Sequence, residues 1–153
     1  YEALRSEFLQ RYEQACLVHT RIFAAVEPVL EALDAAQHRW GIVTNKAERF
    51  THPIVQGLGL HTRAAVLVCG DTTPHSKPHP APLLEAARRA GVDGARCIYI
   101  GDDLRDVQAG RAAGMATLAA GWGYLGQGEP IDAWGADAVL PEPAALLQWL
   151  ELP

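Results

Sequence analysis

An apolar run that ends in a glycine and three carboxylates constrains this chain more than any other part of its sequence. Residues 97–100, Cys-Ile-Tyr-Ile, carry no charge and are mostly β-branched or aromatic, which is typical of a parallel strand buried on both faces. Gly101 lets the backbone turn, and Asp102, Asp103 and Asp106 follow it directly. The sequence therefore predicts a buried strand that ends in a polar site.

The three carboxylates are predicted to converge where the next helix begins. Asp103 is in position to cap that helix, and Asp106, three residues on, falls on the same helical face. Close carboxylates repel one another unless a cation joins them, and an all-oxygen ligand set suits Mg²⁺ better than zinc. The alternative is an ordinary aspartate cap with solvated neighbours. The combination Gly-Asp-Asp-x-x-Asp at the end of a buried strand favours the metal site.

Strand-like and helical patterns alternate along the chain. The strand-like runs are 40–44, 65–69, 97–100, 116–120 and 136–140. The helical patterns between and after them are 27–37, 47–58, 82–90, 103–113 and 143–150. This alternation predicts an α/β fold with a parallel sheet, right-handed crossovers, helices on both faces and a site at the carboxyl ends of the strands. An amphipathic helix at 1–16 precedes the pattern and has nothing of its own to pack against.

Composition narrows the class of protein. A chain of 153 residues is long enough for one domain with a proper core, and its apolar runs are too short to span a membrane. The net charge of −5, without a basic stripe, argues against nonspecific nucleic-acid binding. Cys16, Cys69 and Cys97 are far apart and odd in number, so they predict free thiols rather than disulfides or a zinc site. No secretory leader opens the chain, and we expect a cytoplasmic protein that does not bind membranes.

Polar residues follow three of the predicted strands. Thr44 and Asn45 end the first strand region, Lys77 lies in the loop after the second, and the carboxylates follow the third. A hydroxyl with nearby backbone N–H groups can hold phosphate oxygens, while a lysine and Mg²⁺ can neutralise a phosphoryl group in transfer. Taken singly, Thr44 is equally well explained as a strand-end hydroxyl, and Lys77 is better explained as a solvated loop lysine. Their joint position after successive strands favours phosphate chemistry, although no nucleophile is apparent.

These motifs resemble those of the haloacid dehalogenase superfamily of phosphatases. The segments that carry the resemblance are 42–45 (Ile-Val-Thr-Asn), 76–80 (Ser-Lys-Pro-His-Pro) and 101–106 (Gly-Asp-Asp-Leu-Arg-Asp). The resemblance implies that Thr44 binds the substrate phosphoryl group beside Asn45 and that Lys77 steadies the nucleophile and the phosphate. It implies that Asp102 binds Mg²⁺ directly. Asp103 and Asp106 would bind the ion through water molecules or hold the groups that bind it.

The first motif of that superfamily, Asp-x-Asp-Gly-Thr, does not occur in the sequence. In the superfamily it supplies the nucleophile from a strand that precedes a helical cap. The resemblance therefore implies that residues 1–18 are the end of the cap and that 19–153 form a Rossmann-like three-layer core. It places the nucleophilic aspartate before Tyr1, so that the 153 residues alone are expected to be inactive.

The amino-acid sequence resembles the bacterial phosphoglycolate phosphatase branch in four segments, 1–4, 40–46, 121–124 and 134–137. This implies Mg²⁺-dependent hydrolysis of 2-phosphoglycolate to glycolate and phosphate through an aspartyl-phosphate. A sister branch acts on N-acetylmuramic acid 6-phosphate, and a broad sugar-phosphate phosphatase also stays open. The expected partner is a small phosphorylated metabolite, and the protein a monomer or homodimer.

Two rival interpretations are not enzymes. A two-component receiver also combines a parallel sheet, carboxylates, threonine and lysine, but it presents its acidic pair early, whereas Thr44 and Lys77 precede the carboxylates here. A phosphatase-derived binding module would apply if the first motif is truly lost. Reading the sequence upstream of Tyr1 would separate it from an enzyme.

Three further signals are weaker. Gly121-x-Gly123-x-x-Gly126 matches a dinucleotide fingerprint, but Pro130 and its neighbours disfavour the helix that should follow, so a loop beside the site is expected. His75 and His79 flank Lys77 in a proline-rich loop with no cysteine nearby, which favours loop-stabilising or solvated roles over metal binding. Lys46 is equally well explained as a charge for an anionic substrate or as a surface residue.

Overall fold

The structure, a computed structural model, describes residues 1–152 and confirms the alternation of strands and helices. Its helices are α1 (Glu2–Ala15), α2 (Glu27–Ala35), α3 (Glu48–Gly57), α4 (Ala81–Ala90), α5 (Leu104–Ala112) and α6 (Ala145–Trp149). Its strands are β1 (Gly41–Val43), β2 (Val66–Val68), β3 (Ile98–Gly101), β4 (Ala116–Ala120) and β5 (Ala138–Leu140). Short 3-10 turns, η1 (Leu60–Thr62), η2 (Gly94–Arg96) and η3 (Ile131–Ala133), complete the connections. Each α-helix and β-strand extends at most one residue beyond its predicted range, which confirms the α/β fold.

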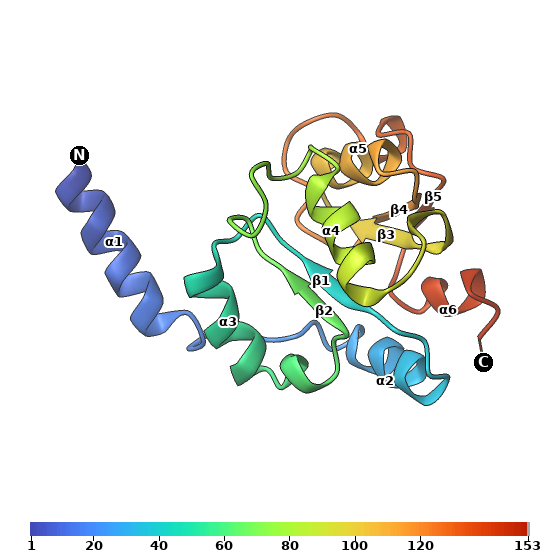
Figure 1. Ribbon diagram of the computed structural model, residues 1–153, viewed down its shortest axis with the longest axis horizontal. Helices are drawn as coiled ribbons and strands as arrows, with labels where there is room; N and C mark the ends of the chain where they lie inside the picture. The colour runs from blue at the N-terminus through green and yellow to red at the C-terminus, as the bar shows by residue number, and fades with distance from the viewer. Residues whose placement is uncertain (153) are drawn as a thin grey trace.

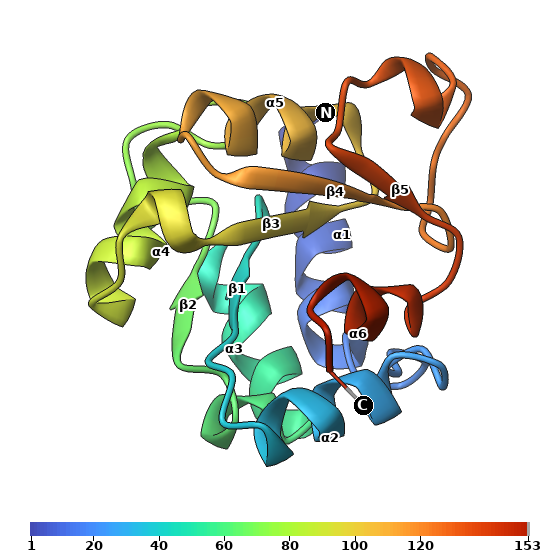
Figure 2. The ribbon, with the colours of Figure 1, turned by 90° about the vertical axis from the view of Figure 1, so that its right-hand side faces the viewer.

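The strands form two parallel sheets where a single sheet was expected. β1 pairs with β2 in the register Ile42–Leu67, and the second sheet has the order β3-β4-β5. Across residues 1–152 no ladder joins β1 to β3. Figure 2 shows β3, β4 and β5 running across the view and β1 and β2 running at a steep angle to them.

A cavity of about 580 Å³ separates the two sheets. Its walls include Gly41 and Val43 of β1, all of 98–100 in β3, and Leu83 of α4. This cavity explains why β3 is half-buried along its whole length, whereas the sequence predicted burial on both faces. Ile98 and Ile100 pack against one buried cluster and Tyr99 against another, while the edge of β3 that faces β1 borders the cavity.

Helices cover both faces of the β3–β5 sheet, as predicted. Leu118 and Ala119 of β4 are fully buried and, being adjacent in a strand, point to opposite faces. Leu118 packs in a cluster with residues of α2 and α6, namely Val29, Leu33 and Leu146. Ala119 packs with Val107 of α5 and with Trp134. Figure 2 shows α5 above this sheet and α6 with α2 below it.

Helix α1 projects away from the rest of the molecule (Figure 1) and buries none of its residues. Its contact with the remainder is made by Tyr12, whose ring lies edge-on to Phe50 of α3 at 5.4 Å between centroids and whose hydroxyl accepts a hydrogen bond from Lys46 Nζ. Leu4 and Phe8 stay 72% and 65% exposed. The assignment of residues 1–18 to a separate cap stays a prediction. Within the described part of the chain, no helix combines the length and apolarity that a membrane crossing requires.

Candidate functional site

The carboxyl end of β3 and the start of α5 form the centre of the site. Asp103 caps α5, because its side chain accepts a hydrogen bond from the Arg105 backbone N–H at 2.9 Å. In return Asp106 Oδ2 accepts the Asp103 backbone N–H at 3.2 Å, which completes a capping box. Gly101 is required here, since a Cβ at that position would collide with the Asp106 side chain. The predicted cap is therefore confirmed.

Protein cations compensate two of the three carboxylates. Arg105 Nε and Nη2 each approach one oxygen of Asp103 at 2.8 Å, and these hydrogen bonds lower the pKa of Asp103 to about 2. Lys77 Nζ lies 2.7 Å from Asp106 Oδ1. The sequence argument required a cation beside these carboxylates, and Arg105 and Lys77 supply positive charge to two of them, so their convergence does not by itself require a metal ion. Among residues 1–152 no group of three acidic, histidine or cysteine side chains is arranged to hold a metal.

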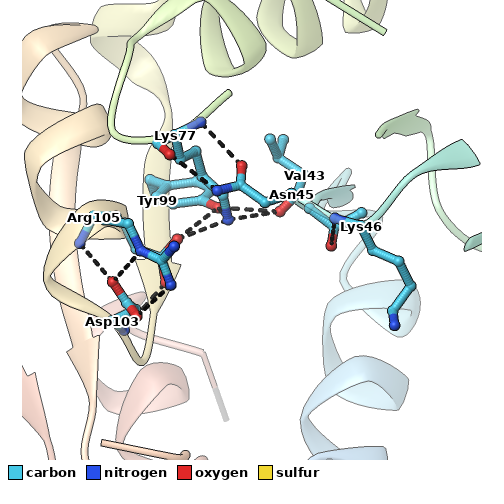
Figure 3. A network of polar contacts seen from close by, with 9 residues as sticks. Val43, Asn45, Lys46, Lys77, Tyr99, Asp103 and Arg105 are labelled. Atoms are coloured by element: carbon cyan, nitrogen blue, oxygen red, sulfur yellow. Dashed lines mark hydrogen bonds and ion pairs between the residues drawn. The ribbon is translucent and has the colours of Figure 1, made fainter. Parts of the chain in front are cut away.

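Lys77 reaches the site from the loop after β2 and is buried there. Its side chain is 10% exposed, and that of Asp106 is 9% exposed. The ammonium group also donates to the Tyr99 hydroxyl at 2.8 Å and to the Val43 carbonyl at 3.1 Å (Figure 3). A solvated loop lysine, the alternative left open by the sequence, does not describe this side chain.

Asn45 fastens the loop after β1 to the loop that carries Lys77. Its side-chain amide donates to the Lys77 carbonyl at 2.9 Å, and its Oδ1 accepts the Lys77 backbone N–H at 3.0 Å (Figure 3). Thr44 lies just before it, where its Oγ1 accepts the Lys46 N–H at 3.1 Å and so tightens the turn. The two strand ends are thus brought to one place, as the topology predicted.

Of the three site carboxylates, Asp102 is the one that forms no ion pair with a residue of 1–152. Its Oδ2 accepts a hydrogen bond from the Tyr124 backbone N–H at 2.8 Å. The loop after β4 can come this close because residue 123 is glycine: a Cβ at Gly123 would overlap the Asp102 carboxyl group. Asp102 therefore keeps its negative charge uncompensated at the strand end, and an oxygen donor of this kind fits a Mg²⁺ ion.

A polar hollow of about 330 Å³ collects most of these groups. It is lined by Asn45, Lys77, Asp102, Asp103, Arg105, Asp106 and Tyr124. Of the residues proposed from the sequence, Thr44 lies outside this lining, and the other five line it. The roles of all six in binding and catalysis stay predictions.

Sequence reasoning missed Tyr99, Arg105 and Tyr124. Tyr99 is the one polar-tipped residue in an apolar strand, and its alternation with Ile98 and Ile100 was the available signal. Burial, with the neighbouring Asp106 charge, raises the pKa of Tyr99, so its hydroxyl stays protonated. Arg105 could have been noted as the one cation inside the acidic segment. Tyr124 enters through its backbone, which no sequence pattern reveals.

The weaker signals fit their plainer explanations. The rings of His75 and His79 lie 4.4 Å apart between centroids at an interplanar angle of 34°, and His79 Nδ1 accepts the Ala81 N–H at the start of α4. Residues 121–130 form a loop, and the next element is η3, so the glycine pattern lacks the helix that nucleotide binding requires. Cys16, Cys69 and Cys97 are all free.

A family model described as haloacid dehalogenase-like hydrolase matches residues 1–120. The chain belongs to this family. It is 43% identical over 146 residues to the N-acetylmuramic acid 6-phosphate phosphatase of Pseudomonas putida, covering 95% of this chain and 66% of that protein. It is 49% identical over 146 residues to the phosphoglycolate phosphatase of Xanthomonas campestris pv. campestris, again covering 95% and 66%. This member of the haloacid dehalogenase-like hydrolases thus spans just under two thirds of the length of the curated relatives it matches.

Solved structures of a phosphatase and of a hydrolase share the fold. A predicted phosphoglycolate phosphatase from Haemophilus somnus 129pt superposes with a TM-score of 0.87 and 27% identity, over 95% of this chain and 64% of that one. A hydrolase from Pseudomonas syringae superposes with a TM-score of 0.79 and 25% identity, over 98% and 68%. The resemblance noted in the motifs is therefore a family relationship that extends over nearly the whole of this haloacid dehalogenase-like chain.

Proposed function

We propose that the complete protein is a Mg²⁺-dependent phosphatase of small phosphate monoesters, with 2-phosphoglycolate as its substrate. The observation that carries this proposal is the polar hollow in which the buried Lys77 ammonium and the uncompensated Asp102 carboxylate face one space. A cation and a metal-binding anion that line one hollow suit a phosphoryl group, which carries negative charge on several oxygens. The phosphatase names of the relatives support the same reaction class.

Lys77 is proposed to neutralise charge on the phosphoryl group, and Thr44 with Asn45 to hold its oxygens. Lys77 is buried and fixed, so its charge acts at short range with little reorganisation during reaction. Asn45 holds the Lys77 backbone through two hydrogen bonds, which fixes the lysine loop beside the loop of Thr44. The arrangement of these two loops therefore supports the binding of one phosphoryl group between Lys77 and Thr44.

Asp102 is proposed to hold the Mg²⁺ ion directly. Asp103 is paired with Arg105 and Asp106 with Lys77. These two carboxylates are therefore proposed to bind the ion through water molecules or to support the groups that bind it. When bound, the ion would draw negative charge from the phosphoryl oxygens and reduce the repulsion of an incoming anion.

The nucleophile is proposed to be an aspartate before Tyr1, on a strand that fills the cavity between β1 and β3. That cavity measures about 580 Å³, is lined mostly by apolar residues, and runs between the unpaired edges of β1 and β3. Such an aspartate would bond to phosphorus as the ester P–O bond breaks, and the second aspartate of the first motif, as general acid, would donate a proton to the leaving alkoxide oxygen. Water would then cleave the aspartyl-phosphate and release inorganic phosphate.

N-acetylmuramic acid 6-phosphate is the second candidate substrate, because two relatives with that activity in their names are 43% and 44% identical to the chain. Both candidates are small phosphorylated metabolites.

The free cysteines support a cytoplasmic location.

The test uses the complete protein with Mg²⁺ and compares kcat/KM on 2-phosphoglycolate, N-acetylmuramic acid 6-phosphate and common sugar phosphates. A preference for 2-phosphoglycolate is expected. A preference for the muramic acid ester would transfer the assignment to the second candidate and leave the reaction class intact. Hydrolysis of none of them would contradict the phosphatase itself and favour the binding module.

A further inference from the structure

We propose that Tyr99 is a positioning residue for Lys77, an inference that rests on the proposed phosphatase function. The Tyr99 hydroxyl accepts a hydrogen bond from Lys77 Nζ at 2.8 Å and lies 3.2 Å from the Val43 carbonyl, to which it donates. One hydroxyl group thus connects the lysine, the end of β1 and the interior of β3. No motif of the sequence assigned this residue a role.

The Lys77 ammonium has three hydrogens and three protein acceptors. These acceptors are Asp106 Oδ1 at 2.7 Å, the Tyr99 hydroxyl at 2.8 Å and the Val43 carbonyl at 3.1 Å. They come from α5, β3 and β1 respectively, so the ammonium is held from three elements. Asp106 balances the charge, while the two neutral acceptors fix the direction of the group.

Tyr99 suits this task because its own position is fixed. Its ring packs against the buried cluster formed by Leu83 and Ala87 of α4, Ala109 of α5 and Met115. Lys77, in contrast, carries its charge on a flexible four-carbon stem that extends from a loop. A rigid aromatic hydroxyl therefore limits where the ammonium can lie, and catalysis by a fixed charge depends on that placement.

The hydroxyl also links the two separate sheets. Across residues 1–152 β1 and β3 share no ladder, yet Tyr99 of β3 bonds to the carbonyl that ends β1. The phosphate-binding turn at Thr44 follows that carbonyl directly. Tyr99 therefore sets the distance between the lysine and the turn that is proposed to hold the phosphoryl oxygens.

The test replaces Tyr99 with phenylalanine in the complete protein, with Mg²⁺ present, and measures kcat and KM separately on the ester that the parent hydrolyses best. Removing the hydroxyl keeps the ring in the core and removes one acceptor of a charged donor. The expected result is a fall in kcat of roughly 10-fold with KM changed by less than about 2-fold. The matched control is Tyr12→Phe, which removes a hydroxyl of α1 that accepts a hydrogen bond from Lys46 Nζ. This control is expected to keep the parent kcat.

Each result decides the proposal. An unchanged kcat in folded Tyr99→Phe, or an equal fall in both variants, would overturn the positioning role while the phosphatase assignment stands. A Tyr99→Phe protein whose circular dichroism shows it to be unfolded would also overturn it, because the hydroxyl would then serve the fold. A parent that hydrolyses no phosphate ester would instead refute the proposed function.

Discussion

Lys77 and Asp106 form a buried ion pair that joins the loop after β2 to the first turn of α5. The ammonium nitrogen lies 2.7 Å from a carboxylate oxygen, and about one tenth of each side chain is exposed. Burying two charges is tolerated because each has further hydrogen-bond partners, Tyr99 and Val43 for the lysine and the Asp103 N–H for the carboxylate. The pair therefore belongs to two features at once: Asp106 is part of the capping box of α5, and Lys77 is part of the proposed phosphate site.

Lys77→Met should impair both stability and catalysis. It leaves Asp106 buried without a cation, so the free energy of unfolding should fall by about 3–5 kcal/mol in urea denaturation. In the complete protein, kcat should fall by roughly 100- to 1000-fold, because a fixed charge is lost at the phosphoryl site.

The double variant Lys77→Met with Asp106→Asn separates these effects. Removing the second charge should recover most of the lost stability, measured in the same urea titration, without recovering kcat. Recovery of both would mean that Lys77 acts in folding alone.

Asp102→Asn should weaken Mg²⁺ binding without disturbing the fold. Asparagine keeps an oxygen for the Tyr124 N–H but removes the uncompensated charge. Isothermal titration calorimetry of the complete protein should show Mg²⁺ affinity lowered by more than about 10-fold. Asp132→Asn, at an exposed position in η3, is the control and should bind as the parent does. Equal affinity in Asp102→Asn would refute the proposed ligand.

Gly123→Ala should displace Asp102 without removing any ligand. The added methyl group would overlap the Asp102 carboxyl group, so either the carboxylate or the loop after β4 must move. Mg²⁺ affinity should fall, and the free energy of unfolding should fall by about 1–3 kcal/mol. Gly128→Ala in the same loop meets nothing within 4 Å and serves as control. A Gly123→Ala protein with parental Mg²⁺ affinity would argue against the role of this close approach.

Asp34 should make stability depend on acid pH. Its carboxylate accepts hydrogen bonds from Trp40 Nε1 at 2.8 Å and Arg63 Nε at 2.7 Å, which lower its pKa below the usual value. A lowered folded-state pKa contributes stability above the unfolded pKa of about 3.9, and this contribution is lost as the pH falls through the folded value. Asp34→Asn should therefore have a lower urea midpoint than the parent at pH 7, and the difference should shrink below about pH 4. A difference that is constant with pH would contradict this linkage.

Much of the fold could be predicted because its signals are local. Apolar periodicity indicated the strands and helices to within a residue or two, and Gly91 and Gly114 indicated where α4 and α5 end. Asp103 was predicted as a cap from its position alone. The candidate site could be predicted in outline because parallel strands end at a common edge. The sequence argument on charge did not consider Arg105 as the partner of Asp103, because it looked for a metal ion as the compensating cation.

The sequence by itself determined the order of strands and helices, the family and the set of polar residues that follow the strands, because these depend on periodicity, turn chemistry and short motifs. The tertiary structure alone decided which charges meet. Lys77 pairs with Asp106 and Tyr99, 29 and 22 positions away, and Asp102 bonds to a backbone N–H 22 positions away. Such contacts depend on how the strands are stacked and how closely Gly101 and Gly123 let the chain approach, and the spacing along the sequence does not encode either.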